Sequence, residues 1–247
     1  MLFRSRADVL TVVCLFLFAA AGFVSVVLPG TATYAQDQPG KVYRIGFLRA
    51  GPPPAAYLEG FQQGLRERGY VYGQNVVVEF RATDGSLDQL PRFAEELVRL
   101  KVEVILASAA PAALAAKKAT TSVPIVFVGV VDPVDLGLVL SLGRPGGNIT
   151  GLATNSADLA GKRLELLRAI VPRLKRAAVL WHPANPTNPI QLKAAQAAAR
   201  TLGVQLEPVS VQGPNDFDSA VRAVRGTDGL LQLESPLFIT LDRKSVV

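Results

Sequence analysis

Cysteine and histidine each occur only once in this 247-residue sequence. The cysteine, Cys14, lies inside an apolar run near the N-terminus and follows Val13, which is larger than the residue that precedes a lipid-modified cysteine. The rest of the chain therefore has no thiol that could form a disulfide bond or act as a nucleophile. A single histidine, His182, argues against a histidine-rich metal site and against a histidine-based catalytic triad.

Sequence motifs of catalysis and of nucleotide binding are also missing. The chain has no G-x-G-x-x-G after a strand, no G-x-x-x-x-G-K-[ST] and no G-x-S-x-G. Asp132 and Asp135 could form a carboxylate pair, but their spacing near an expected helix start is more typical of acidic residues that interact with the positive end of the helix dipole. We therefore expect a protein with no enzymatic activity, no cofactor and no metal.

The first 35 residues have the pattern of a secretory signal peptide. Arg4 and Arg6 precede a nearly unbroken apolar run over 9–28, and Thr33-Tyr34-Ala35 provides a small-x-small cleavage site. We expect cleavage before Gln36 and a periplasmic or other extracytoplasmic location. The alternative is an uncleaved membrane anchor, because about 20 apolar residues can span a bilayer.

Charge is spread along the chain rather than collected in blocks. The formal net charge is +6, and two arginines and one aspartate of this total belong to the first 35 residues. Basic and acidic residues alternate in stretches such as Arg66-Glu67-Arg68, which is typical of solvated helix faces. We expect no nucleic-acid partner and a monomeric protein.

Short apolar runs alternate with segments of helical periodicity, which indicates an α/β protein. Strands are predicted over 43–48, 76–80, 102–107, 124–128, 177–181, 204–211 and 229–233, with a turn and a further strand over 144–152. Helices are predicted over 57–68, 87–100, 110–119, 135–142, 157–170, 189–202 and 216–224. The pattern predicts two doubly wound parallel-sheet lobes with a hinge, an N-terminal lobe over 36–152 and a C-terminal lobe over 153–241.

Small, polar and turn residues follow the predicted strands, at the edge where parallel sheets bind ligands. Ser108, at the start of a helix, could bind a carboxylate together with free main-chain N–H groups, or it could only cap that helix. Asn185, Thr187 and Asn188 offer amide and hydroxyl groups, with capping of the next helix as the alternative. Tyr57 and Trp181 could contact a ligand, although a tryptophan at a strand end more often belongs to the core.

Three blocks of the chain resemble exported substrate-binding proteins of ABC transporters, in the family that includes tryptophan- and tyrosine-binding proteins. They are "YRIGFLRAGPPPAAYLEGFQQGLRERGYVYGQNVVVEFRATDG", "LPRFAEELVRLKVEVILASAAPAALAAKKATTSVPIVFVGVVDPVDLGLVLSLGRPGGNITGL" and "GKRLELLRAIVPRLKRAAVLWHPANPTN". The resemblance covers about residues 42–240. It implies a type I periplasmic-binding fold, in which two lobes close over a small solute and the closed form docks on a membrane permease.

The resemblance also implies a solute site in the loops at the carboxyl ends of the strands. Our hypothesis is that Ser108 and adjacent amides bind a carboxylate there and that Asp132 binds an amine. The implied solute is an amino acid or a similar aromatic acid, and the implied partner is an ABC permease. A periplasmic sensor domain that feeds a membrane receptor is the alternative function. The residues carried over from the family are Ala50, Gly51, Ser108, Ala109, Ala110, Val131, Asp132, Asn185, Thr187, Asn188 and Ser235.

The end of the chain departs from this family. Members continue beyond the strand predicted over 229–233, whereas this sequence stops with "FITLDRKSVV". The last six residues, 242–247, read as the translation of a widely used sequencing adapter. We therefore expect the second lobe to be incomplete, with an unpaired sheet edge.

Overall fold

The computed structural model describes residues 40–154 and 156–241. The expected signal peptide over 1–35, with Cys14, and the adapter-like tail over 242–247 lie outside these ranges. Within them, no helix combines the length and apolar character needed to cross a bilayer.

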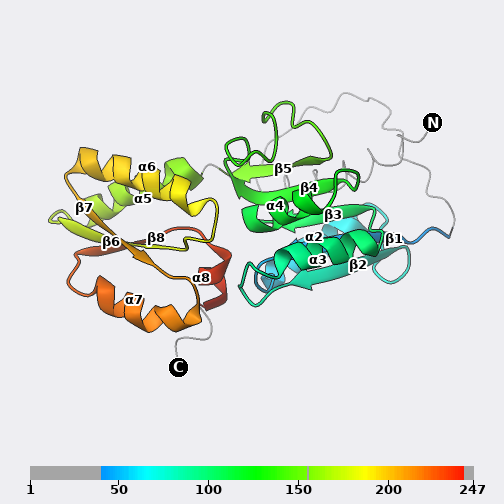
Figure 1. The fold of residues 1–247 in the computed structure, drawn as a ribbon, viewed down its shortest axis with the longest axis horizontal. Coiled ribbons are helices and arrows are strands. Elements are labelled where there is room, and N and C mark those ends of the chain that lie inside the picture. The colour runs from blue at the N-terminus through cyan, green and yellow to red at the C-terminus, as the bar shows by residue number, and fades with distance from the viewer. Residues whose placement is uncertain (1–39, 155, 242–247) are drawn as a thin grey trace.

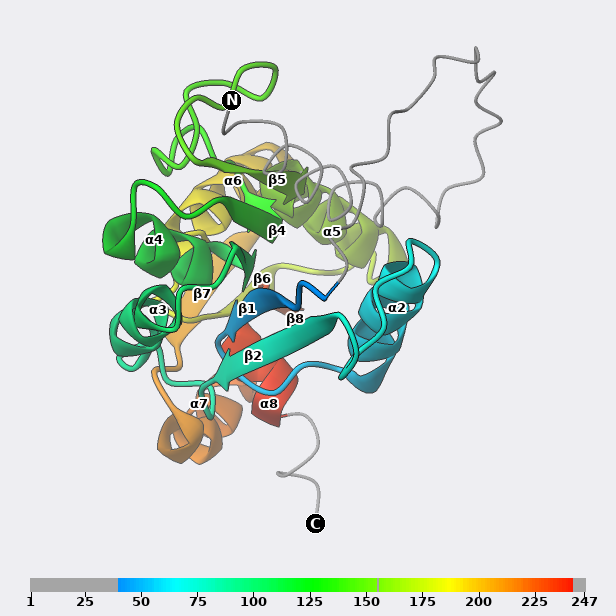
Figure 2. The ribbon, with the colours of Figure 1, turned by 90° about the vertical axis from the view of Figure 1, so that its right-hand side faces the viewer.

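A five-stranded parallel sheet with the strand order β2-β1-β3-β4-β5 forms the first lobe (Figure 1). Its elements are strands β1 (Tyr43–Arg49), β2 (Val76–Ala82), β3 (Val104–Ser108), β4 (Ile125–Val131) and β5 (Ile149–Thr154), and helices α2 (Ala55–Arg66), α3 (Leu90–Arg99) and α4 (Ala110–Ala119). The strands and helices predicted here are confirmed with shifts of a few residues at their ends, apart from the helix over 135–142. Figure 2 shows α2 on one face of this sheet and α3 with α4 on the other.

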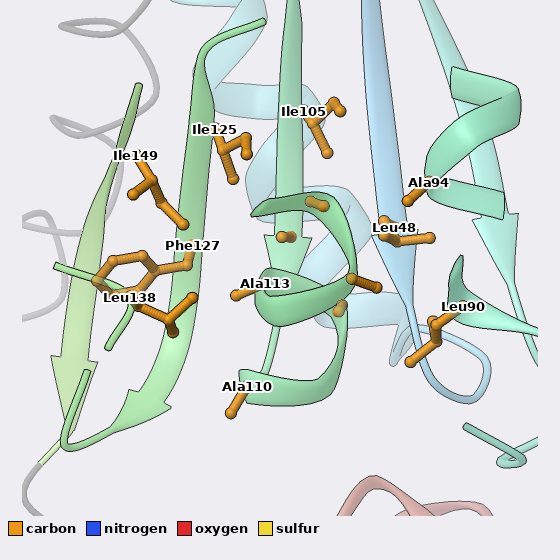
Figure 3. Close-up of a cluster of buried hydrophobic side chains, with 14 of the residues drawn as sticks. Leu48, Leu90, Ala94, Ile105, Ala110, Ala113, Ile125, Phe127, Leu138 and Ile149 are labelled. Carbon is orange, nitrogen blue, oxygen red and sulfur yellow. The ribbon is translucent and has the colours of Figure 1, made fainter. Parts of the chain in front are cut away.

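Both faces of the first sheet are buried, which explains why its strands read as continuous apolar runs. Along β3, Ile105 packs towards α3 and α4, whereas Val104 and Leu106 pack on the α2 face. Figure 3 shows the cluster beneath α4, in which small alanines let the helix approach the sheet closely. The labelled residues of this cluster are Leu48, Leu90, Ala94, Ile105, Ala110, Ala113, Ile125, Phe127, Leu138 and Ile149.

The prediction of a short helix over 135–142 is wrong. The chain makes a single turn after β4, in which the N–H groups of Leu138 and Val139 both donate to the carbonyl oxygen of Pro133. Gly137 has a φ of 65°, in the left-handed region, so the helix cannot continue. Leu138 and Val139 then pack into the core of the first lobe. Their apolar character is therefore explained by burial and not by helical geometry.

A three-stranded parallel sheet with the order β7-β6-β8 forms the second lobe. Its elements are strands β6 (Arg176–Trp181), β7 (Gln205–Ser210) and β8 (Gly229–Gln232), helices α5 (Ser156–Ile170), α6 (Asn188–Leu202), α7 (Phe217–Val224) and α8 (Pro236–Leu241), and a 3₁₀ turn at Pro214–Asp216. Helices α5 and α6 cover one face, and α7 and α8 cover the other. Gly203 ends α6 with a φ of 65°, as its position in the sequence predicts.

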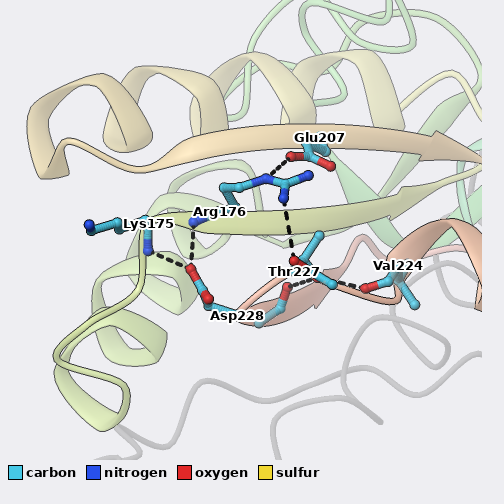
Figure 4. Close-up of polar contacts among 8 residues, drawn as sticks. Lys175, Arg176, Glu207, Val224, Thr227 and Asp228 are labelled. Atoms are coloured by element: carbon cyan, nitrogen blue, oxygen red, sulfur yellow. Dashed lines mark hydrogen bonds and ion pairs between the residues drawn. The ribbon is translucent and has the colours of Figure 1, made fainter.

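Polar contacts fix the register of the second sheet at its amino edge (Figure 4). The Asp228 carboxylate accepts hydrogen bonds from the main-chain N–H groups of Arg176 at 2.9 Å and Lys175 at 2.8 Å. These two bonds, with the Arg176 bond first, lower the pKa of Asp228. Arg176 also reaches Glu207 on β7, with Nε 2.6 Å from Oε1. Strands β7 and β8 are therefore both tied to the start of β6.

The two sheets point their carboxyl edges towards each other. In Figure 1, β1 runs from the outer side of the first lobe towards the second lobe. Helix α8 follows β8 and lies on the side of the second lobe that faces the first. Because both sheets are parallel, the loops after all their strands gather at these two facing edges.

Candidate functional site

Arg49 and Ser108 are neighbours at the carboxyl edge of the first sheet. They are paired in register at the ends of β1 and β3, so both side chains lie on the α2 face. The Arg49 Nη1 donates a hydrogen bond of 2.7 Å to the Ser108 Oγ. Only 5% of the Arg49 surface is exposed, so the guanidinium is enclosed at the edge to which both lobes contribute loops.

The Arg49 charge has no acidic partner in residues 40–154 and 159–238, the ranges whose side chains the structure describes. Its Nε is buried and makes no hydrogen bond there, and Ser108 is the only hydrogen-bond partner of its side chain in those ranges. Its guanidinium carbon lies 5.9 Å from the centre of the Tyr57 ring, a cation–π contact. Burial lowers the pKa of Arg49, although an arginine stays protonated at neutral pH.

Helix α4 begins two residues after Ser108, with no side chain capping its first turn. Capping of α4 by Ser108, the alternative raised by the sequence, is therefore not what the structure shows; the hydroxyl instead accepts from Arg49. Ala109, between Ser108 and the helix, has φ 69° and ψ 164°, a conformation normally reserved for glycine. The positive end of α4 is left available at this edge of the sheet.

Thr83 holds the loop after β1 in place. Its Oγ1 accepts hydrogen bonds of 3.2 Å from the N–H groups of Gly51 and Gly85, and its own N–H donates to the carbonyl oxygen of Arg49. Ala50 is only 1% exposed, and Gly51 needs its positive φ of 84° to turn away from the sheet. Ala50 and Gly51 therefore offer the site mainly main-chain groups.

Sequence reasoning did not assign roles to Arg49 and Thr83. A signal for Arg49 exists, because β1 is otherwise buried over its last residues and a charged side chain ends it. Thr83 follows the end of β2, a strand end that the sequence did not single out. Its role depends on loops that only the folded chain brings together.

Val131 ends strand β4, which lies between β3 and β5 in the sheet, and Asp132 follows it at the same carboxyl edge. Val131 is buried, whereas Asp132 is half-buried and has a φ of 49°. Its carbonyl oxygen accepts from the N–H of Leu136, and its carboxylate has no hydrogen bond or ion pair with the residues that the structure describes. No helix follows Asp132, so its carboxylate caps none and remains available at the edge.

The predicted site residues of the second lobe are brought together, but their side chains bond mainly to one another. Asn188 is fully buried; its Oδ1 accepts from the N–H of His182 at 2.7 Å and its Nδ2 donates to the carbonyl oxygen of Glu234 at 2.8 Å. The Asn185 Nδ2 donates to the same oxygen at 3.1 Å. These bonds tie the loop after β6 to the loop after β8.

Thr187 and Ser235 complete this network. The Thr187 Oγ1 donates to the Asn185 Oδ1 at 3.0 Å, and the Ser235 Oγ lies 3.1 Å from the His182 Nδ1. Gln191 joins it by accepting from the N–H of Glu234 at 3.0 Å. The network fixes two loops of the second lobe at the facing edge, and a solute contact of its side chains stays a prediction.

His182 and Trp181 lie just inside this edge. His182 is 3% exposed, and burial lowers its pKa because the charged imidazolium is poorly solvated there. Trp181 is half-buried and packs against the core between β6, α5 and α6, whereas Tyr57 on α2 is 63% exposed. Residues 40–154 and 156–241 contain no cluster of three or more His, Cys, Asp or Glu that could hold a metal ion.

Known proteins are similar to this chain in sequence and in fold. The family model described as ABC transporter substrate binding protein matches residues 49–236. A tyrosine-binding protein from Clostridioides difficile strain R20291 is 28% identical over 187 residues, which cover 72% of this chain and 54% of that protein. The chain thus spans about half the length of this relative.

Two solved structures are similar over most of the chain. One is the ABC domain from Streptococcus pneumonia in complex with L-Trp, with 27% identity, a TM-score of 0.71 and coverage of 81% of this chain and 70% of that one. The other is a ligand-free, open substrate-binding protein with adhesive properties from Clostridium difficile, with 28% identity, a TM-score of 0.53 and coverage of 79% and 67%. The two parallel-sheet lobes are those of the type I periplasmic-binding fold. With residues 49–236 matched, well over half of its length, the chain belongs to the ABC transporter substrate-binding protein family.

Proposed function

We propose that this protein captures a small amino acid or aromatic acid between its two lobes and delivers it to an ABC permease in the membrane. The observation that carries this proposal is the facing pair of carboxyl edges, each lined by the loops of a parallel sheet. The relatives with the same fold include one protein named for tyrosine binding and one solved with L-Trp. The role is capture and release of a solute, without catalysis.

The solute contacts proposed on the first lobe are Ser108, the main-chain groups of Ala109 and Ala110, and Asp132. The uncapped start of α4 favours a carboxylate, because its free N–H groups and the helix dipole both attract a negative charge. The unpaired carboxylate of Asp132 favours an amine. On the second lobe, the network of Asn185, Thr187, Asn188 and Ser235 supports the opposing loops and presents their main-chain edge to the solute.

Thermal unfolding of the purified chain with L-tyrosine, L-tryptophan and other amino and aromatic acids tests solute binding. A ligand present at 100 times its Kd stabilises the folded state by about 2.7 kcal/mol, which raises the Tm by roughly 5 °C or more. Ribose serves as a control solute without carboxylate or amine. The proposal is wrong if no amino acid or aromatic acid shifts the Tm beyond the ribose control.

Delivery and location need cellular measurements. We expect uptake of the labelled solute to fall when the chain is deleted from cells that hold its permease and ATPase. A loss of signalling without a loss of uptake would instead identify a sensor. We also expect the mature protein in the periplasmic fraction with Gln36 as its first residue. An intact N-terminus in the membrane fraction would show that the leader is retained as an anchor.

A further inference from the structure

Arg49 is a buried cation at the carboxyl edge of the first sheet, and the described chain provides no anion for it. The ion pairs of residues 40–154 and 159–238 do not include it, although its surface is only 5% exposed. The nearby arginine Arg81, on β2, illustrates the ordinary arrangement. Its Nε lies 2.9 Å from the Glu96 Oε2 and its Nη1 lies 3.8 Å from the Glu79 Oε2.

A buried charge without a partner is unfavourable, and proteins rarely keep one unless it binds something. A packing role would be filled at lower cost by an apolar side chain, as at the other buried positions near the end of β1. The neighbours of Arg49 are a serine hydroxyl, the face of a tyrosine ring and the positive start of α4, and none of them carries a formal negative charge. The missing component of this group is an anion.

The hydrogen bonding leaves suitable donors for that anion. Of the guanidinium nitrogens only Nη1 is bonded within the described chain, so the edge formed by Nε and Nη2 is unpaired. This edge matches the two oxygens of a planar carboxylate. Ser108 accepts from Arg49, and its own O–H proton is therefore free to donate to the same anion.

We propose that Arg49 is the carboxylate-binding cation of the solute site, with the Ser108 hydroxyl and the start of α4 as its partners. This inference rests on the proposed function and names its specificity: the solute is an organic acid whose carboxylate enters the first lobe and pairs with Arg49. The solute charge replaces the missing counter-ion, so binding and neutralisation of the guanidinium occur together.

Isothermal titration calorimetry on the full chain tests the inference with matched pairs of solutes and variants. L-tryptophan and L-tyrosine are compared with tryptamine and tyramine, which lack only the carboxylate. We expect the two amines to bind at least about 30-fold more weakly, because truncation of one partner of a buried charge pair has an effect of this size. Arg49→Met should weaken binding of the two amino acids by a similar factor, and Ser108→Ala by about 5- to 10-fold.

Two further variants separate a direct contact from a folding effect. Arg49→Lys keeps the charge but loses the planar fork, and we expect an intermediate loss of about 10-fold. Arg81→Met removes the arginine that already has acidic partners, and we expect affinity within about 2-fold of the unchanged chain. Thermal unfolding of Arg49→Met should show an unchanged or raised Tm without solute, because an unpaired buried charge has been removed.

The outcomes distinguish this inference from the proposed function. The role of Arg49 would be overturned if Arg49→Met bound both amino acids with unchanged affinity, or if the two amines bound as tightly as the amino acids. Either result would leave solute capture intact. Inorganic phosphate or sulfate bound as tightly as the amino acids would overturn the assignment to an organic carboxylate. Absence of binding by every amino acid and every aromatic acid tested would overturn both proposals.

Discussion

Replacement of Asn188 by alanine should destabilise the second lobe by about 2–4 kcal/mol. Asn188 is fully buried, and its side chain satisfies the N–H of His182 and the carbonyl oxygen of Glu234. In Asn188→Ala the His182 N–H loses its partner, which costs about 1–3 kcal/mol in a buried position. The Glu234 oxygen keeps its bond from Asn185, so the rest of the loss comes from the small cavity left by the amide.

Urea unfolding followed by tryptophan fluorescence measures this change directly. Trp181 is the only tryptophan of the chain and directly precedes His182, so its emission reports on the lobe that is perturbed. Asn215→Ala is the matched control, because Asn215 is exposed and makes no hydrogen bond with the described residues. We expect the control to stay within about 0.5 kcal/mol of the unchanged chain.

The structural interpretation of Asn188 fails if Asn188→Ala unfolds like the control. If Asn188→Ala unfolded like the control but bound solute more than about 10-fold more weakly, Asn188 would be a direct solute contact, as the family resemblance implies. A midpoint shift with solute affinity reduced only in proportion to the unfolded fraction would support a purely positioning role.

Three other substitutions test separate parts of the structure. Gly151→Ala on β5 should destabilise the first lobe by about 1–3 kcal/mol, because the added Cβ would lie 2.1 Å from the Phe127 carbonyl oxygen. Urea unfolding followed by circular dichroism measures this loss, and an unchanged unfolding midpoint would contradict the close packing of Gly151 against Phe127. Ala109→Gly should raise the free energy of unfolding by about 1 kcal/mol in the same assay, because glycine adopts the φ of 69° at this position without strain. A loss of stability would show that the strain is absent. His182 has a pKa below its ordinary value, so the unfolded chain binds the proton more tightly and stability should be lost as pH falls below about 6.5. His182→Asn should remove the dependence of the unfolding free energy on pH between pH 5 and 7, and an equal dependence in the variant would exclude His182 as its cause. An NMR titration of His182, the chain's only histidine, should give its pKa in the folded state directly.

Much of the fold could be predicted from the sequence, because burial on both faces of a parallel sheet leaves continuous apolar runs that differ plainly from the amphipathic helices between them. The rule that loops after parallel strands gather at the carboxyl edge of the sheet also placed Ser108 and Asp132 correctly at that edge. The same reasoning failed over 135–142, where the apolar spacing is helical but Gly137 turns the chain the other way.

The detailed roles at the edge were decided only by tertiary structure. Arg49 meets Ser108 across 59 residues of sequence, and Asn188 meets Glu234 across 46. Hydrogen-bond partners so far apart leave no local periodicity, so a serine that accepts a hydrogen bond from an arginine on a neighbouring strand and a serine that caps its helix look the same in the sequence. What separates them is which strands lie side by side: the order β2-β1-β3 places an unpaired guanidinium next to Ser108, and the order β7-β6-β8 joins the two loops that enclose Asn188.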